Sequence, residues 1–177
     1  MTTIRLLTGD DAAAFQSLRL QGLLECPTAF ASSHAEEAGE SIAAVAERLK
    51  PDGVFGVYGA FDEAGRLVGV AGLGRERMRR LAHKAVLWGM YVAPSARRLG
   101  VARRIVSHLL QQAAGEPGLR QVNLGVLATN GPARALYASF GFVAWGHEPA
   151  AAWDERGPHD ETWMVCVLPG RQASAQA

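Results

Sequence analysis

The chain has 177 residues, a formal net charge of +1 at pH 7, 49% hydrophobic residues and 20% charged residues. This is the composition of an ordinary globular protein that can bury one sizeable core, which argues against a second domain. We therefore expect one domain over residues 1–169 and a disordered, alanine-rich tail over residues 170–177. No signal-peptide pattern and no apolar run of about eighteen residues is present, so we expect a cytoplasmic protein.

Basic residues gather between positions 75 and 104, which hold nine of the eighteen lysines and arginines against one acid, Glu76. Such a stretch could bind nucleic acid, but the isoelectric point near 7.9 is low for that class and no aromatic residues are interleaved with the arginines. The favoured interpretation of residues 75–80 is a solvated loop or edge. Nucleic-acid binding stays the lesser alternative.

The N-terminal part of the chain predicts a strand and two helices. Apolar and polar residues alternate over Thr3–Leu7, as in a half-buried strand. The capping-box pattern Thr8-x-x-Asp11 begins a helix that runs to about Glu25, because the residue before Pro27 avoids helical angles. A second helix begins at Ser41, a good N-cap, and carries apolar residues at helical spacing.

The central part predicts three strands and a helix. Segments rich in valine and glycine at Val54–Phe61 and Leu67–Leu73 predict two strands, joined by a hairpin turn at residues 62–65. A third strand, Lys84–Val92, runs into a basic, glycine-containing turn and then into an amphipathic helix that ends at residues 115–118.

The C-terminal elements are predicted to be a strand at 122–126, a helix at 132–139, strands at 142–146 and 162–168, and a connecting loop at 149–159. The hairpin requires antiparallel neighbours, whereas strand–helix–strand units favour parallel ones. The order therefore predicts an α/β (α+β) protein with a mixed, twisted, mostly antiparallel sheet of about six to seven strands flanked by helices.

The turn that follows Val92 is the most informative segment. The first N–H groups of a helix lack partners within the helix and carry the positive end of its dipole, and Arg97 and Arg98 add full charges. Gly100 lets a ligand approach the backbone closely. Neither the G-x-x-x-x-G-K-S/T loop nor a strand-linked G-x-G-x-x-G occurs. We therefore expect a phosphate-binding turn of another type.

Two motifs carry a resemblance to a known family. Arg97-x-x-Gly100-x-Ala102 resembles the pyrophosphate-binding pattern Gln/Arg-x-x-Gly-x-Gly/Ala of the GNAT superfamily of acyl-CoA-dependent N-acetyltransferases. The segment from Asn130 to Phe142 is similar to the second helix with which that family contacts its cofactor. The resemblance extends roughly from Val54 to Leu168. It implies the GNAT fold, in which two central strands splay apart around the acyl chain.

The resemblance also implies an activity: direct transfer of an acetyl group from acetyl-CoA to a primary amine. We favour a small-molecule amine over a protein N-terminus, and a polyamine, an amino acid, an aminoglycoside-like drug and a protein N-terminus all stay open as acceptors. It assigns acetyl-CoA to the end of the third strand, the basic turn and the second motif: Met90, Tyr91, Val92, Arg97, Arg98, Leu99, Gly100, Val101, Ala102, Arg103, Asn130, Ala133 and Tyr137. Tyr137 is the expected general acid for the leaving thiolate. Its alternative role is that of a packing aromatic.

The sequence departs from the family at the general base. Several members carry a glutamate on the strand that corresponds to Lys84–Val92, and this strand has no carboxylate between its ends. The remaining candidates are Glu36 and Glu37 with His34, Tyr91 through water, and Asp160 and Glu161 with His159. A non-catalytic domain that binds acyl-CoA as a sensor is therefore the first alternative.

The expected partner is a small-molecule or peptide amine, and the acidic balance of residues 24–40 and 149–161 hints at a protonated one. We expect no metal, because His, Cys and carboxylates do not recur at paired ligand spacing. We expect no nucleic acid and no membrane as partners. Exposed edge strands make a homodimer possible.

Overall fold

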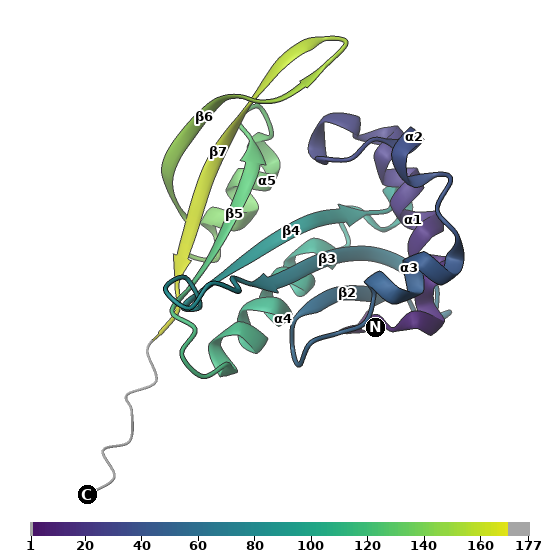
Figure 1. Ribbon diagram of the computed structural model, residues 1–177, viewed down its shortest axis with the longest axis horizontal. Coiled ribbons are helices and arrows are strands. Elements are labelled where there is room, and N and C mark those ends of the chain that lie inside the picture. The colour runs from purple at the N-terminus through teal and green to yellow at the C-terminus, as the bar shows by residue number, and fades with distance from the viewer. Residues whose placement is uncertain (1, 170–177) are drawn as a thin grey trace, which may run out of the picture.

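The computed structural model describes residues 2–169 and contains a twisted seven-stranded sheet in the order β1-β2-β3-β4-β5-β7-β6 (Figure 1). The strands are β1 Thr3–Leu6, β2 Gly56–Phe61, β3 Leu67–Arg75, β4 Lys84–Val92, β5 Gln121–Leu127, β6 Val143–Asp154 and β7 Gly157–Val167. All neighbours are antiparallel except β4 and β5, which are parallel. The predicted mixed, mostly antiparallel sheet is confirmed. The predicted tail at 170–177 lies outside the described residues.

Helices cover both faces of the sheet (Figure 1). One face carries α4 Val101–Gly115 and α5 Gly131–Ala138, and the other carries α1 Ala12–Glu25, α2 His34–Glu37 and α3 Ile42–Arg48. Short 3₁₀ turns occupy Gly9–Asp11, Pro27–Ala29 and Pro94–Ala96. Within residues 2–169, none of these helices is long and apolar enough to cross a membrane.

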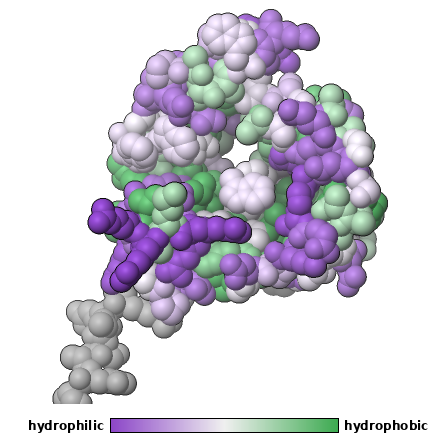
Figure 2. All heavy atoms as spheres, viewed as in Figure 1, coloured by the Kyte–Doolittle hydropathy of each residue, from purple (hydrophilic) through white to green (hydrophobic). Residues whose placement is uncertain are grey.

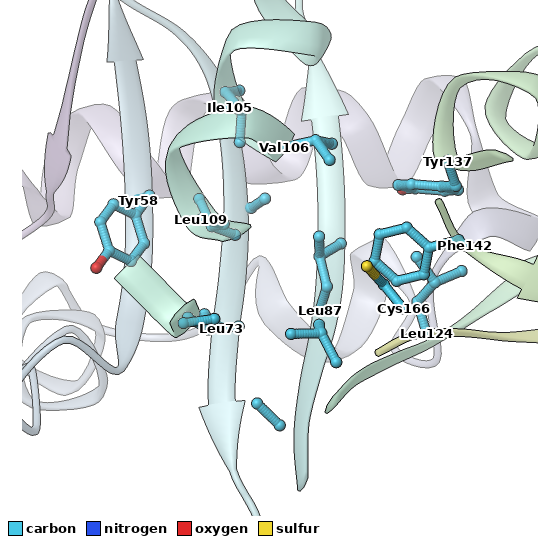
Figure 3. Packing of buried hydrophobic residues seen from close by; sticks show 14 of the residues in the cluster. Tyr58, Leu73, Leu87, Ile105, Val106, Leu109, Leu124, Tyr137, Phe142 and Cys166 are labelled. Atoms are coloured by element: carbon cyan, nitrogen blue, oxygen red, sulfur yellow. The ribbon is translucent and has the colours of Figure 1, made fainter. Parts of the chain in front are cut away.

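Each helical layer has its own hydrophobic core. On the α4 side, Ile105, Val106 and Leu109 are buried against Leu73 and Leu87 of the central strands (Figure 3). On the other side, residues of α1 and α3 pack against β2 and β3: Phe15, Leu18, Val45, Leu49, Val57 and Val70. Because apolar burial drives packing on both faces, the central strands are held in fixed positions.

Helix boundaries follow the local sequence signals. The Thr8–Asp11 capping box is present, with a 3₁₀ turn before α1 begins at Ala12. The Ser41 hydroxyl accepts a hydrogen bond of 3.2 Å from the N–H of Ala44 at the start of α3. Asn130 caps α5 in the same way, since its Oδ1 accepts from the N–H of Ala133 at 3.1 Å.

Strand β4 contains a bulge that separates it from β5. Its register against β3 passes from Gly72 opposite Trp88 to Val70 opposite Tyr91, so β4 has one extra residue there, and Gly89 adopts a φ of +62°. The parallel pairing with β5 joins only Lys84–Val86 to Gln121–Asn123. Beyond these residues the two strands diverge, as the family resemblance implied.

The prediction of a loop at 149–159 was wrong. These residues continue β6 and β7 as a long antiparallel hairpin that projects beyond the rest of the sheet (Figure 1). Pro149 and the left-handed Ala150, with a φ of +51°, interrupt the pairing between Glu148 and Ala152. This irregularity breaks the alternation by which strands are recognised in a sequence.

Candidate active site

A cavity of about 110 Å³ lies where β4 and β5 diverge. Its walls come from the end of β4, from β5, from α5 and from β7, and include Trp88, Met90, Gly125, Asn130, Ala133, Tyr137 and Glu161. The space-filling view is hollowed between the half that contains β5–β7 and the half that contains α1 and α2 (Figure 2). The fold therefore brings the second sequence motif against the end of β4. We call this space the gap cavity.

The turn before α4 presents a helix N-terminus to solvent. Gly100 has a φ of +78° and no side chain caps the helix that begins at Val101. Arg98 is also left-handed, with a φ of +62°, a strained conformation for a residue with a side chain. Both residues are exposed, as is Arg103 in the first turn of α4. Free N–H groups and positive charges at one point form a site for an anion.

The side chain of Arg97 is turned toward the protein. Its Nε donates to the carbonyl of Val92 at 3.0 Å, and its Nη1 lies 2.5 Å from Oε1 of Glu25 at the end of α1. The Tyr91 hydroxyl donates to Oε2 of the same carboxylate at 2.6 Å. Both hydrogen bonds lower the pKa of Glu25, and the one from Tyr91 has the larger effect. Arg97 and Tyr91 thus attach the basic turn to α1 through their side chains.

Tyr137 lies in the wall of the gap cavity, with 6% of its surface exposed. Its ring packs edge-to-face on Phe142 at 5.7 Å between centroids (Figure 3). The other two tyrosine hydroxyls are occupied, since Tyr58 donates to Val54 and Tyr91 to Glu25. That of Tyr137 has no hydrogen-bond partner among residues 2–169. Burial raises its pKa to about 12, so the phenol keeps its proton at neutral pH.

Three of the four candidate carboxylate bases are engaged elsewhere. Glu36 accepts from the N–H and hydroxyl of Ser33 and completes a capping box on α2. Glu37 is buried and pairs with Arg19 at 2.8 Å. Asp160 accepts from the N–H of Ala150 at 2.9 Å and lies 3.0 Å from Nε2 of His147.

Glu161 is the candidate base that lines the gap cavity. Its carboxylate lies over Gly125, where a Cβ would come within 2.6 Å of Oε2. Burial raises the pKa of Glu161, and the nearby Glu148 raises it further. A carboxylate with a raised pKa and a neutral phenol therefore border the same small space, which is an arrangement suited to acid–base chemistry.

Trp88 is a site residue that the sequence analysis did not identify. It is 47% exposed and lines the gap cavity. The signal in the sequence was indirect: β3 carries glycines at 72 and 74, and both approach the indole. Small residues on one strand make room for a large side chain on its neighbour.

Residues 20–142 match the model of the Acetyltransferase (GNAT) family. This match covers more than half of the chain. The chain therefore belongs to the GNAT family of acetyltransferases, and it is an acyltransferase. No curated protein sequence matches it.

Solved structures share the fold at low sequence identity. A GNAT-family acetyltransferase from Streptococcus pneumoniae has a TM-score of 0.77 and 19% identity, over 96% of this chain and 100% of that one. A ribosomal-protein-alanine N-acetyltransferase from Brucella melitensis has a TM-score of 0.76 and 25% identity, over 94% and 99%. A phosphinothricin acetyltransferase from Sinorhizobium meliloti, solved in complex with AcCoA, has a TM-score of 0.75 and 21% identity, over 94% and 88%.

Proposed function

We propose that this protein transfers an acetyl group from acetyl-CoA to a primary amine by direct attack of the amine on the thioester. The observation that carries the proposal is the gap cavity, in which Tyr137 and Glu161 border the space between two diverging strands. The uncapped N-terminus of α4, with Arg98 and Arg103 exposed beside it, provides the anion site that a pyrophosphate needs.

The edge of β4 provides a place for an extended ligand. After Val86 this strand no longer pairs with β5, and its residues 87–90 line the gap cavity. Unpaired backbone groups of a strand bind an extended chain by main-chain hydrogen bonds, which suits the amide-containing arm of coenzyme A. A backbone N–H near Met90 would also polarise the thioester carbonyl.

The two cavity side chains have complementary roles in this proposal. Acetyl-CoA, when bound, supplies the activated acyl group. Glu161 takes a proton from the ammonium group, because its raised pKa makes it a better base than an ordinary carboxylate. The amine nitrogen then bonds to the acyl carbon as the carbon–sulfur bond breaks. Tyr137 donates its proton to the departing thiolate. The new amide nitrogen loses its second proton, which returns to Tyr137 through solvent, and Glu161 releases the proton that it took to solvent.

Thermal stability with and without acetyl-CoA tests the proposal before the acceptor is known. A ligand at about one hundred times its Kd adds roughly 2.7 kcal/mol, which is several degrees in Tm for a chain of this size. Gly100→Glu should lose most of this shift, because it places a carboxylate at the anion site.

Gly65→Glu is the matched control for that variant. Gly65 lies in the β2–β3 hairpin with a φ of +74°, close to the +78° of Gly100, and a Cβ added at either position would meet open space. The two variants therefore carry similar backbone strain, and Gly65→Glu should keep the full acetyl-CoA shift. Absence of any shift in the unaltered protein at saturating acetyl-CoA would contradict the proposal.

The absence of a carboxylate between the ends of β4 favours one alternative, a domain that binds acyl-CoA without catalysis. Release of free thiol from acetyl-CoA in the presence of amines separates the two functions. Binding without thiol release across amines of every charge type would favour the sensor.

A further inference from the structure

A second cavity, of about 350 Å³, lies beside the gap cavity on the face of the sheet covered by α1 and α3. Its apolar walls are Phe15, Leu49, Val57 and Trp88, and its polar walls are Arg19, Glu37 and Arg48. Trp88 lines both cavities, so the two spaces share a wall. A largely apolar space of this size suits a small organic group rather than a polypeptide. We call it the side cavity.

Arg19, in the wall of the side cavity, is held rigidly by its neighbours. Glu37 accepts from its Nε at 3.1 and 3.2 Å and from its Nη2 at 2.8 Å, and Nη2 also donates to the Ser32 hydroxyl. The guanidinium lies over the ring of Phe30, 4.3 Å from the centroid. A side chain fixed on so many sides loses little entropy when it binds a ligand.

One nitrogen of Arg19 is left for a ligand. Nη1 has no hydrogen-bond partner in the part of the chain that the structure describes. It lies 3.9 Å from the position of a Cβ on Gly89, at the β4 bulge that opens the gap cavity. A fixed, charged donor with no partner, next to the proposed reaction centre, is suited to bind a carboxylate.

The charges around the side cavity argue against a polycationic acceptor. Glu37 is occupied by Arg19, and Arg48 lies 3.8 Å from the same carboxylate and pairs with Glu40 at 2.9 Å. The acidic residues of this region, which in the sequence hinted at a cationic substrate, are thus largely neutralised by arginines. Glu37 and Glu40 balance Arg19 and Arg48, so the walls offer no net negative charge to attract a polycation.

We propose that the acceptor is an amino carboxylate with an apolar side chain, such as an apolar amino acid. Its carboxylate would bind Nη1 of Arg19, its side chain would fill the side cavity against Trp88, and its amine would reach the gap cavity near Glu161. An α-amino acid carries these three groups on one carbon, which fits two adjacent cavities with a shared wall. The inference rests on the proposed acetyl transfer.

The test compares amino acids with their decarboxylated counterparts. Thiol release from acetyl-CoA is measured with L-phenylalanine and L-leucine, with 2-phenylethylamine and isopentylamine, and with spermidine. A charge-assisted hydrogen bond to the carboxylate predicts kcat/KM values for the amino acids at least about tenfold above those of the matching amines. Equal or faster turnover of the amines or of spermidine overturns the inference.

A variant locates the carboxylate site. Arg19→Gln should raise the KM for L-phenylalanine about ten- to hundredfold and raise the KM for 2-phenylethylamine much less, because only the amino acid carries the carboxylate. Arg66→Gln is the control, since Arg66 pairs with Asp62 in the exposed β2–β3 hairpin. If the unpaired Glu37 prevents folding, the double variant Arg19→Gln/Glu37→Gln removes both charges together. An unchanged KM in the folded variant overturns the inference.

The Tm shift produced by acetyl-CoA distinguishes failure of the amino-carboxylate proposal from failure of the proposed acetyl transfer. A protein that is stabilised by acetyl-CoA but acetylates neither amino acid contradicts the amino carboxylate and leaves the proposed function standing. A protein without that shift contradicts both.

Discussion

The indole of Trp88 on β4 covers Gly72 on β3. A Cβ placed on Gly72 would overlap Cε2 and Cζ2 of the indole and would lie 2.5 Å from Cδ2. No real side chain tolerates such contacts, so the orientation of Trp88 depends on the absence of a side chain at position 72. Since Trp88 lines both the gap cavity and the side cavity, the absence of a side chain at Gly72 affects the shape of both.

Gly72→Ala should therefore displace the indole and remodel both cavities. Trp88 is half-exposed and can move outward, so we expect stability to fall by no more than about 1 kcal/mol while the acceptor KM rises several-fold. Gly74→Ala is the matched control on the same strand, because a Cβ there lies 3.6 Å from the indole nitrogen. Tryptophan fluorescence and acceptor kinetics report the change; identical values for both variants would show that the indole is not displaced.

Tyr137→Phe should lower kcat by about 10²-fold, at the lower end of the range for general acids, because a pKa of about 12 makes the phenol a weak acid. The Tm shift produced by acetyl-CoA should persist, since the ring and its contact with Phe142 remain. Steady-state rates and thermal unfolding measure the two effects. Loss of the acetyl-CoA shift together with the rate would instead give Tyr137 a binding role.

Glu161→Gln should lower activity by about 10²-fold or more and raise stability at neutral pH. The folded protein binds the Glu161 proton more tightly than the unfolded chain, because burial and Glu148 raise this pKa. The contribution of the Glu161 carboxyl group to the free energy of unfolding is therefore largest below the ordinary glutamate pKa and is lost as pH rises through the raised pKa. Denaturant unfolding at pH 4 and pH 7 measures the free energy of unfolding of both proteins, and Glu161→Gln should be the more stable one only at pH 7. A variant that is less stable than the unaltered protein at pH 7 would contradict this prediction.

Glu37→Gln should lower the free energy of unfolding by roughly 2–3 kcal/mol, because Arg19 would lose its buried partner. Burial opposes ionisation of Glu37, but hydrogen bonds from Arg19 and Ser32 outweigh it and lower its pKa. The stability from this ion pair is thus present at neutral pH and lost as pH falls through the lowered pKa.

Glu47→Gln serves as the control for this prediction, since its ion pair with Lys50 is exposed on both sides and should contribute less than about 1 kcal/mol. Acid unfolding curves should show the parent losing its advantage over Glu37→Gln below the ordinary glutamate range. Equal stabilities of the Glu37 and Glu47 variants at pH 7 would contradict a structural role for the buried pair.

Local signals in the sequence predicted most of the fold. The cap at Ser41, the stop before Pro27 and the turn with Gly100 each act within a few residues, and the structure contains them all. Features that depend on distant partners were not predictable. The outer part of the β6–β7 hairpin passes through Pro149, and the contact between Arg19 and Glu37 joins two helices whose packing no single motif encodes.

The candidate site also contains residues that the sequence could predict and residues that it could not. The two motifs placed Tyr137 near the end of β4, because family patterns carry that information. Glu161 could be named only as one acid among several, since its raised pKa arises from burial over Gly125 and from Glu148 across the hairpin. The side cavity has no sequence signature, because its walls come from five elements: α1, α2, α3, β2 and β4.

The parallel ladder between β4 and β5 joins three residue pairs. The backbone hydrogen bonds therefore divide the sheet into two parts, β1–β4 and β5–β7, which pair with each other only at one end. Outside this short ladder the two parts are joined by side chains of the shared hydrophobic core, not by backbone hydrogen bonds. A ligand lying between the diverging strands would supply the missing hydrogen bonds to β4 and would add backbone contacts to the core that already joins the two parts.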